Sequence, residues 1–136
     1  MNARRIAYWV ATVLIAFVFL SGGVMQSIGV APAVQGITEL GYPGYFATIL
    51  GVWKILGALV VLAPRSPLLK EWAYAGMAFN MTSAAASHAA IGHPTAKVVT
   101  PLVILGIVAA SWALRPASRK LPITPAAPAT LAEAGV

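Results

Sequence analysis

The 136-residue chain contains no cysteine and only three acidic residues. Without cysteine it forms no disulfide, carries out no thiol redox chemistry and has no cysteine-ligated zinc or iron–sulfur cluster. Charged residues make up 9% of the chain, against roughly a quarter in an average soluble domain. This scarcity of charge excludes an ordinary soluble protein.

Hydrophobic residues supply 60% of the chain, and the mean hydropathy is +0.84. This composition is typical of an integral membrane protein, whose surroundings are the lipid bilayer. A membrane-spanning helix needs about 20 apolar residues, and in hydrocarbon each backbone amide must be bonded within its own segment. The sequence therefore predicts an all-α, four-helix membrane bundle as one domain, residues 1–115, with spans at about 6–25, 45–63, 72–91 and 98–114.

The net charge of +6 comes from basic residues that flank these segments rather than forming one basic face, so nucleic acid is not an expected partner. Two precede the first span, two lie between the second and third, three follow the fourth, and Lys97 alone lies on the other side. The positive-inside rule predicts both termini in the cytoplasm of an inner-membrane (plasma-membrane) protein. A cleaved signal peptide at residues 1–25 is the alternative, but this apolar run is longer than a typical signal core.

Three shorter segments connect or follow the spans. Residues 26–44 contain a stretch, Pro32 to Leu40, that predicts a short helix lying on the outer interface or folding over the bundle as a lid. At the turn near Pro64 we expect Arg65, Lys70 and Glu71 to set the orientation and contact headgroups. Residues 116–136, rich in proline and alanine, predict a disordered cytoplasmic tail. An aromatic belt is expected from residues toward the span ends, namely Trp9, Trp72, Tyr74 and Trp112.

Lys54 lies near the middle of the second apolar segment, and no acidic residue lies inside any of the four. A charged lysine at this depth costs about 2.5 to 3.5 kcal/mol, so it needs a polar partner or a function. Gly51, Gly57 and Ala58 share its helical stripe, which directs Lys54 toward the bundle interior. The alternative is a structural role in which the ammonium bonds carbonyl groups and fixes the packing of the helices.

The third segment carries a second stripe that is both small and polar, with Gly76, Asn80, Ser83, Ala84, Ser87 and His88 at helical spacing. Asn80 falls about 12 Å from the cytoplasmic end and Lys54 about 14 Å from the outer end, which makes them plausible partners near the midplane. Gln26, Glu39 and His88 lie nearer the outer end and add further polar groups on that side. Together these residues predict a vestibule for a small lipophilic ligand that bears a carbonyl or anionic oxygen, with candidate ligand-binding residues Lys54, Asn80, Ser83, Ser87, His88, Gln26, Glu39 and Trp53.

Other kinds of site have weaker support. His88 and His93 lie five apart, and with Glu39 they give no recognised metal-ligand spacing, so no metal site is expected. Trp53 either lines the vestibule or faces lipid. No nucleophile–base pair, phosphate loop or dinucleotide fingerprint is present, which removes support for hydrolases, kinases and nicotinamide enzymes.

Several motifs resemble the DoxX-like family of small bacterial membrane proteins. The matching stretches are Leu40 to Pro43, Ile49 to Ala58 with the pattern G-V-x-K-x-L-G-A, Leu69 to Gly76 containing K-E-W-A-Y-A-G, and Ser87-His88. The resemblance extends over about residues 20–114. It implies a four-helix membrane bundle, a quinone as the candidate cofactor or ligand, and a link to membrane redox or oxidative-stress chemistry. Asn80 stands where we expect an acidic residue, and the cysteines of some redox-active relatives are absent.

Three hypotheses about function remain open at this point. The favoured one is a binding protein for a small lipophilic or quinone-like molecule, acting with a membrane redox partner or as a homo-oligomer. The second is a non-catalytic scaffold or assembly factor. The third is a membrane enzyme in which Lys54 and His88 are the candidate catalytic residues and exchange protons with a lipophilic substrate. A transporter or channel has less support, because the polar residues lie mainly in the outer half.

Overall fold

The structure is a computed structural model and describes residues 1–124. Within that range the chain is all-helical and has no β-strand, which confirms the all-α prediction. The predicted short helix after the first span is present, and Gly41, with a φ of +89°, ends that region. The helices are α1 (Ala3–Ser27), α2 (Ala31–Thr38), α3 (Gly44–Leu62), α4 (Pro67–Ala90), α5 (Thr95–Leu114) and a 3-10 turn, η1 (Ala117–Arg119).

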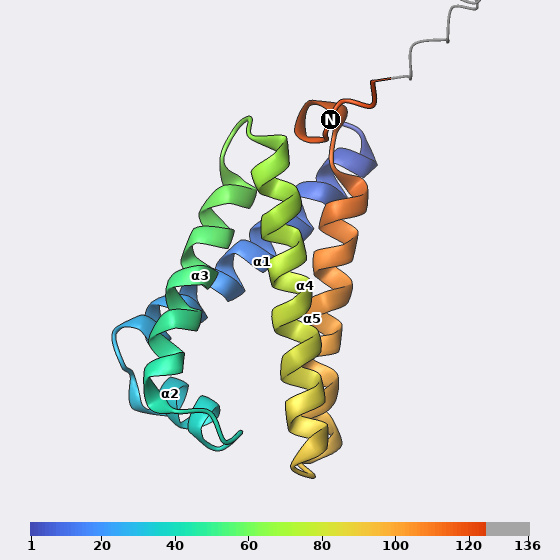
Figure 1. The fold of residues 1–136 in the computed structure, drawn as a ribbon. Coiled ribbons are helices and arrows are strands. Elements are labelled where there is room, and N and C mark those ends of the chain that lie inside the picture. Colours follow the sequence, from blue (N-terminus) through green and yellow to red (C-terminus); the bar gives the residue numbers. More distant parts are fainter. Residues whose placement is uncertain (125–136) are drawn as a thin grey trace, which may run out of the picture.

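The four long helices pack side by side (Figure 1). Helix α1 contacts α3 and α5, α4 contacts α5 and α3, and the short α2 lies against α3. The N-terminus, the 63–66 turn and the end of α5 lie at one end of the molecule, which we call the basic end. Helix α2 and the turn between α4 and α5 lie at the other, the α2 end. From the 63–66 turn, α3 and α4 diverge toward the α2 end.

Three of the helices, α1, α3 and α5, are long and apolar enough to cross a membrane. Helix α4 has 24 residues but is outside this group, and it carries the polar residues Asn80, Thr82 and Ser83. Large apolar side chains are exposed around the described helices, for example Phe17 at 70% and Phe79 at 72%. Such exposure is unfavourable in water and ordinary in lipid, so these helices indicate a bilayer environment.

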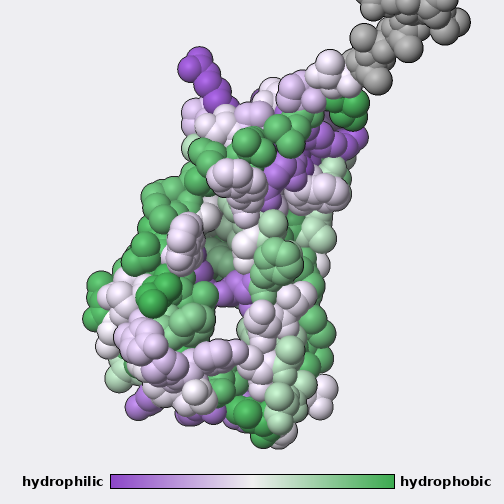
Figure 2. Space-filling model, in the orientation of Figure 1, coloured by the Kyte–Doolittle hydropathy of each residue, from purple (hydrophilic) through white to green (hydrophobic). Residues whose placement is uncertain are grey.

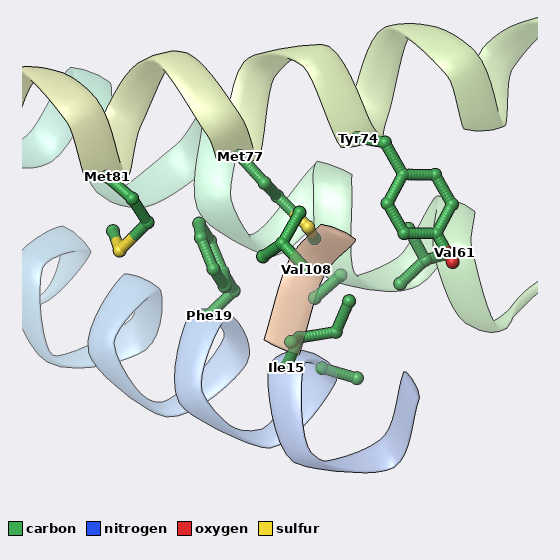
Figure 3. Packing of buried hydrophobic residues seen from close by; sticks show 9 residues of the cluster. Ile15, Phe19, Val61, Tyr74, Met77, Met81 and Val108 are labelled. Carbon is green, nitrogen blue, oxygen red and sulfur yellow. The ribbon is translucent and has the colours of Figure 1, made fainter. Parts of the chain in front are cut away.

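The hydrophobic core joins all four long helices (Figure 3). In this view Phe19 of α1 lies between Met77 and Met81 of α4, and Met77 extends toward Val108 of α5. Most core residues of α3 and α4 lie in the halves next to the 63–66 turn. The buried cluster therefore holds these two helices together near the basic end, with Ile15, Ala16, Phe19, Ala58, Val61, Tyr74, Met77, Met81 and Val108.

Helices α1 and α3 touch through their backbones at Gly23 and Gly51. A Cβ atom placed on Gly51 would lie 2.6 Å from the Gly23 carbonyl oxygen and 2.6 Å from Ser27 Oγ. A Cβ on Gly23 would lie 2.8 Å from the Gly51 carbonyl oxygen. Both positions thus require glycine, and this close approach is the packing that small residues permit between membrane helices.

The segment that follows α5 packs against the helices. Arg119, in η1, donates hydrogen bonds to the Tyr8 hydroxyl at 3.3 Å and to the Val61 carbonyl at 3.1 Å. The first part of the predicted tail thus folds back against α1 and the end of α3. The rest of that predicted tail, residues 125–136, lies outside the described residues.

The α1–α3 contact predicts opposite outcomes for two glycine substitutions. Gly51→Ala should lower the free energy of unfolding by about 1 to 3 kcal/mol, because the new methyl group meets backbone atoms that cannot move aside. Gly22→Ala is the matched control: its Cβ meets nothing within 4 Å, so stability should stay unchanged or rise by up to about 1 kcal/mol. Unfolding followed by circular dichroism in detergent measures both, and equal unfolding midpoints would contradict the packing.

Candidate ligand-binding cavity

A cavity of about 650 Å³ lies between α3 and α4, with α2 and the 39–43 loop at one end. Figure 2 shows the hollow, with hydrophilic surface on its inner wall and hydrophobic surface on both flanks. Most of the lining is apolar. The residues that bear polar groups into it are Lys54, Asn80, Ser83, Ser87 and Tyr42.

Lys54 and Asn80 line this cavity from opposite helices. The residues of the stripe predicted for the second span do not all face the same surroundings. Gly51 and Ala58 are buried, whereas Lys54 is half-buried and lines the cavity. Lys54 and Asn80, expected as partners near the midplane, share no direct hydrogen bond in the structure. Within the described residues neither side chain has a hydrogen bond or an ion pair. Both polar groups are therefore free to bind a molecule in the cavity.

Ser83, Ser87 and Trp53 also line the cavity. The Ser87 hydroxyl lies 3.0 Å from the Tyr42 hydroxyl, and the Tyr42 ring stacks on Phe46 with 5.1 Å between centroids. This contact ties the 39–43 loop to α4 across the α2 end of the cavity. Trp53 is 67% exposed, so its ring forms part of the cavity wall while facing outward.

Three of the candidate ligand-binding residues lie outside the cavity lining. His88 Nδ1 lies 2.7 Å from His93 Nδ1, so the two histidines share a hydrogen bond with each other. Glu39 forms an exposed ion pair with Lys97 at 3.8 Å. Gln26 is buried, and its Oε1 has no hydrogen-bond partner among residues 1–124. The structure thus brings together Lys54, Asn80, Ser83, Ser87 and Trp53, and separates Gln26, Glu39 and His88 from them.

At the basic end a second polar cluster, not expected from the sequence, closes the α3–α4 turn. Lys70, expected at the headgroups, is fully buried and donates hydrogen bonds to the carbonyl oxygens of Val60 and Ala63. Arg119 donates to the Val61 and Ala63 carbonyls. These carbonyls at the end of α3 have no partner within the helix, and positive charge there also suits the helix dipole. The only feature of the sequence that pointed to this cluster was the shortness of the turn between the second and third spans.

Arg115 and Glu71 connect α5 to α4 in the same region. Arg115 is 3% exposed, and its guanidinium donates to Glu71 Oε1 at 2.7 Å, while Trp112 Nε1 donates to Glu71 Oε2 at 2.9 Å. Glu71 lies just before the predicted third span. Burial alone raises the pKa of the Glu71 carboxyl, but these hydrogen bonds and the Arg115 charge outweigh it and hold the pKa below its usual value.

Tyr74, expected in the aromatic belt, is instead 3% exposed and part of the core. Its hydroxyl lies 2.7 Å from Ser111 Oγ, which lies 2.7 Å from Thr12 Oγ1. The chain of hydroxyls links α4, α5 and α1. Buried hydroxyl groups need such partners, so this network fixes the relative positions of three helices.

The cavity has the character of a binding site. An ammonium, an amide and hydroxyls are set in an apolar hollow whose volume falls within the range of about 300 to 1,000 Å³ that holds small ligands. Among residues 1–124 no three histidine, cysteine, aspartate or glutamate side chains gather as a metal site would require. Lys54 and His88, the candidate acid–base pair, do not line the same cavity.

The fold and the apolar helices define an all-helical membrane protein. The chain belongs to the DoxX-like family, because the model of that family matches residues 10–111, from the third turn of α1 to near the end of α5. Comparison with curated proteins and with solved structures gives no significant match.

The Arg115–Glu71 pair predicts an acid-sensitive contribution to stability. Because the folded-state pKa of Glu71 is depressed, its contribution is complete above the unfolded pKa of about 4.3 and is lost as pH falls through the lower folded value. Glu71→Gln should reduce the free energy of unfolding by about 1 to 3 kcal/mol at neutral pH and make its decline in acid shallower. Chemical denaturation at several pH values measures both effects.

Glu39→Gln is the control for that experiment. Its ion pair with Lys97 is long, at 3.8 Å, and both side chains are about half exposed. Its loss should cost less than about 1 kcal/mol. If Glu71→Gln were no more destabilising than Glu39→Gln, the proposed importance of the buried contact would be wrong.

Proposed function

We propose that this chain is a four-span inner-membrane protein that binds a small lipophilic or quinone-like molecule in the α3–α4 cavity, in connection with membrane redox or stress chemistry. Helix α4 is the third of the four spans, since its 24 residues extend about 36 Å, more than the hydrocarbon thickness of about 30 Å. Three of the polar residues that lower its hydropathy, Asn80, Ser83 and Ser87, line the cavity. The basic end is the cytoplasmic side, in agreement with the distribution of lysine and arginine.

The observation that carries this proposal is the position of Lys54 on the wall of a mostly apolar cavity. A charge without a partner is costly at this depth, and such residues inside membrane proteins usually serve function. The separation of α3 from α4 exposes the ammonium to a bound molecule. A lipophilic ligand with a hydrogen-bonding oxygen satisfies both the apolar walls and the polar group.

Binding is better supported than catalysis. The enzyme hypothesis needs Lys54 and His88 to exchange protons with one substrate, but His88 bonds His93 outside the cavity. Proton transfer requires the two groups to lie within hydrogen-bond reach of the same molecule. The binding hypothesis needs only the residues that the cavity already holds.

The scaffold hypothesis has one observation in its favour. A shallow groove of about 280 Å³ runs between α4 and α5 and is lined partly by the small residues Ala75, Ala78 and Ala109. Small residues let a neighbouring helix approach closely, so this groove could receive a helix of a redox partner or of a second copy. The groove lacks the unpaired charge that distinguishes the α3–α4 cavity.

Replacement of Lys54 tests the binding proposal. Native mass spectrometry of protein purified gently from membranes, with extraction of small molecules, should show a specific lipophilic ligand in the wild type. Lys54→Met should lose this ligand because the cavity then lacks its ammonium, whereas Lys97→Met, on the exposed Glu39 ion pair, should keep it. If the wild type retained only bulk phospholipid while Lys54→Met changed the oligomeric state or the proteins that copurify, the scaffold hypothesis would replace this proposal.

A further inference from the structure

The charge of Lys54 has no counter-charge within the described chain. That part of the chain contains two carboxylates, Glu39 and Glu71. Glu39 pairs with Lys97, and Glu71 pairs with Arg115 and accepts from Trp112. Neither carboxylate lines the cavity. A charged lysine in such surroundings is favourable only when an opposite charge approaches it, and the occupant of the cavity is the group that can do so.

The polar side chains that line the cavity with Lys54 can all donate hydrogen bonds. The ammonium has three N–H donors and no acceptor, and the Asn80 amide adds two more. Ser83 follows Asn80 on the same helix at a rise of about 4.5 Å, and its hydroxyl also lines the cavity. An ammonium and further donors in the wall of one cavity favour an oxygen that carries negative charge, since charge-assisted hydrogen bonds are about twice as strong as neutral ones.

The rest of the cavity suits an apolar body. Its walls include Leu50, Leu56 and Met77, and the exposed rings of Trp53 and Phe79 also line it. At the α2 end the Tyr42–Ser87 contact crosses the cavity. The apolar flanks therefore offer a path from lipid, while the α2 end is restricted. A ligand that reaches Lys54 along this path must itself dissolve in the bilayer.

We propose that the cavity binds an amphipathic organic anion, with a carboxylate or similar singly charged head on Lys54 and Asn80 and an apolar chain directed toward the lipid between α3 and α4. This inference rests on the proposed binding function and makes it more specific, because it requires a charged ligand where a quinone would be neutral. A lipophilic acid released from lipids and one taken up from outside the cell share this chemistry.

A matched pair of probes tests the charge requirement. A long-chain fatty acid with a brominated tail and the corresponding brominated alcohol are added to protein in phosphatidylcholine nanodiscs at neutral pH. Bromine quenches nearby tryptophans, and Trp53 and Trp72 line the cavity. Quenching by the acid should reach saturation. The apparent affinity for the acid should be about tenfold higher than for the alcohol, a difference of about 1.4 kcal/mol. The same pair in protein-free nanodiscs corrects for partition into lipid.

Three variants make the result specific to Lys54. Lys54→Met should reduce the affinity for the acid to that for the alcohol, Lys54→Arg should keep the preference for the acid, and Lys97→Met should match the wild type. Lys54→Met should also unfold at a higher temperature than the ligand-free wild type, because it removes an unpaired charge. That expected gain in stability separates loss of binding from loss of fold.

The remaining outcomes overturn one proposal or the other. Equal affinity for acid and alcohol in the wild type, with no effect of Lys54→Met, would refute the anion inference while leaving a lipophilic site in place. Saturable binding of a neutral quinone, with weaker binding of the acid, would do the same and favour the quinone-like ligand. If acid, alcohol and quinone all failed to saturate, the binding function itself would be wrong.

Discussion

The backbone contact between Gly23 and Gly51 is the constraint on which the rest of the arrangement depends. At this contact the backbones of α1 and α3 are so close that no side chain fits between them, so one face of α3 is packed against α1. Helix α4 is committed in turn to α5 and to α1 by the Tyr74–Ser111–Thr12 hydroxyls. With both helices held by other partners, α3 and α4 meet only near the 63–66 turn. The space between them toward the α2 end is therefore left to the cavity.

Polar contacts at the basic end limit the separation of α3 and α4 to the rest of their length. Lys70 and Arg119 cap the carbonyls at the end of α3, and Arg115 holds Glu71 on α4. These contacts tie the ends of α3, α4 and α5 together where the chain turns sharply through Arg65 and Ser66, both at positive φ. Charge thus has two uses in this protein. Lys70, Arg115 and Arg119 close the basic end, whereas Lys54, on the cavity wall, has no partner among the described residues.

Much of the fold was predictable because its causes are local. Continuous apolar segments force helices in a membrane, and their lengths gave bounds within a few residues of α1, α3 and α5. Helical periodicity predicted that Lys54 and Asn80 face a common interior, and both line the cavity, but Gly51, which shares the stripe of Lys54, packs against α1 instead. The burial of Tyr74 and Lys70 did not, because a residue near a span end has the same local sequence whether it faces headgroups or packs under a turn. The grouping of His88 with Lys54 was predicted from shared polarity, and the structure pairs His88 with His93 instead.

The sequence by itself determined the membrane environment, the helical class and the presence of one lysine with no acidic residue in its segment, since these depend only on composition and on the bonding of the backbone in hydrocarbon. Only the tertiary structure decided that Lys54 lines a cavity and has no partner among the described residues. That outcome depends on how closely α3 approaches α1 and how far it departs from α4. Such distances are set by contacts between residues far apart in the chain, and neither periodicity nor composition records them.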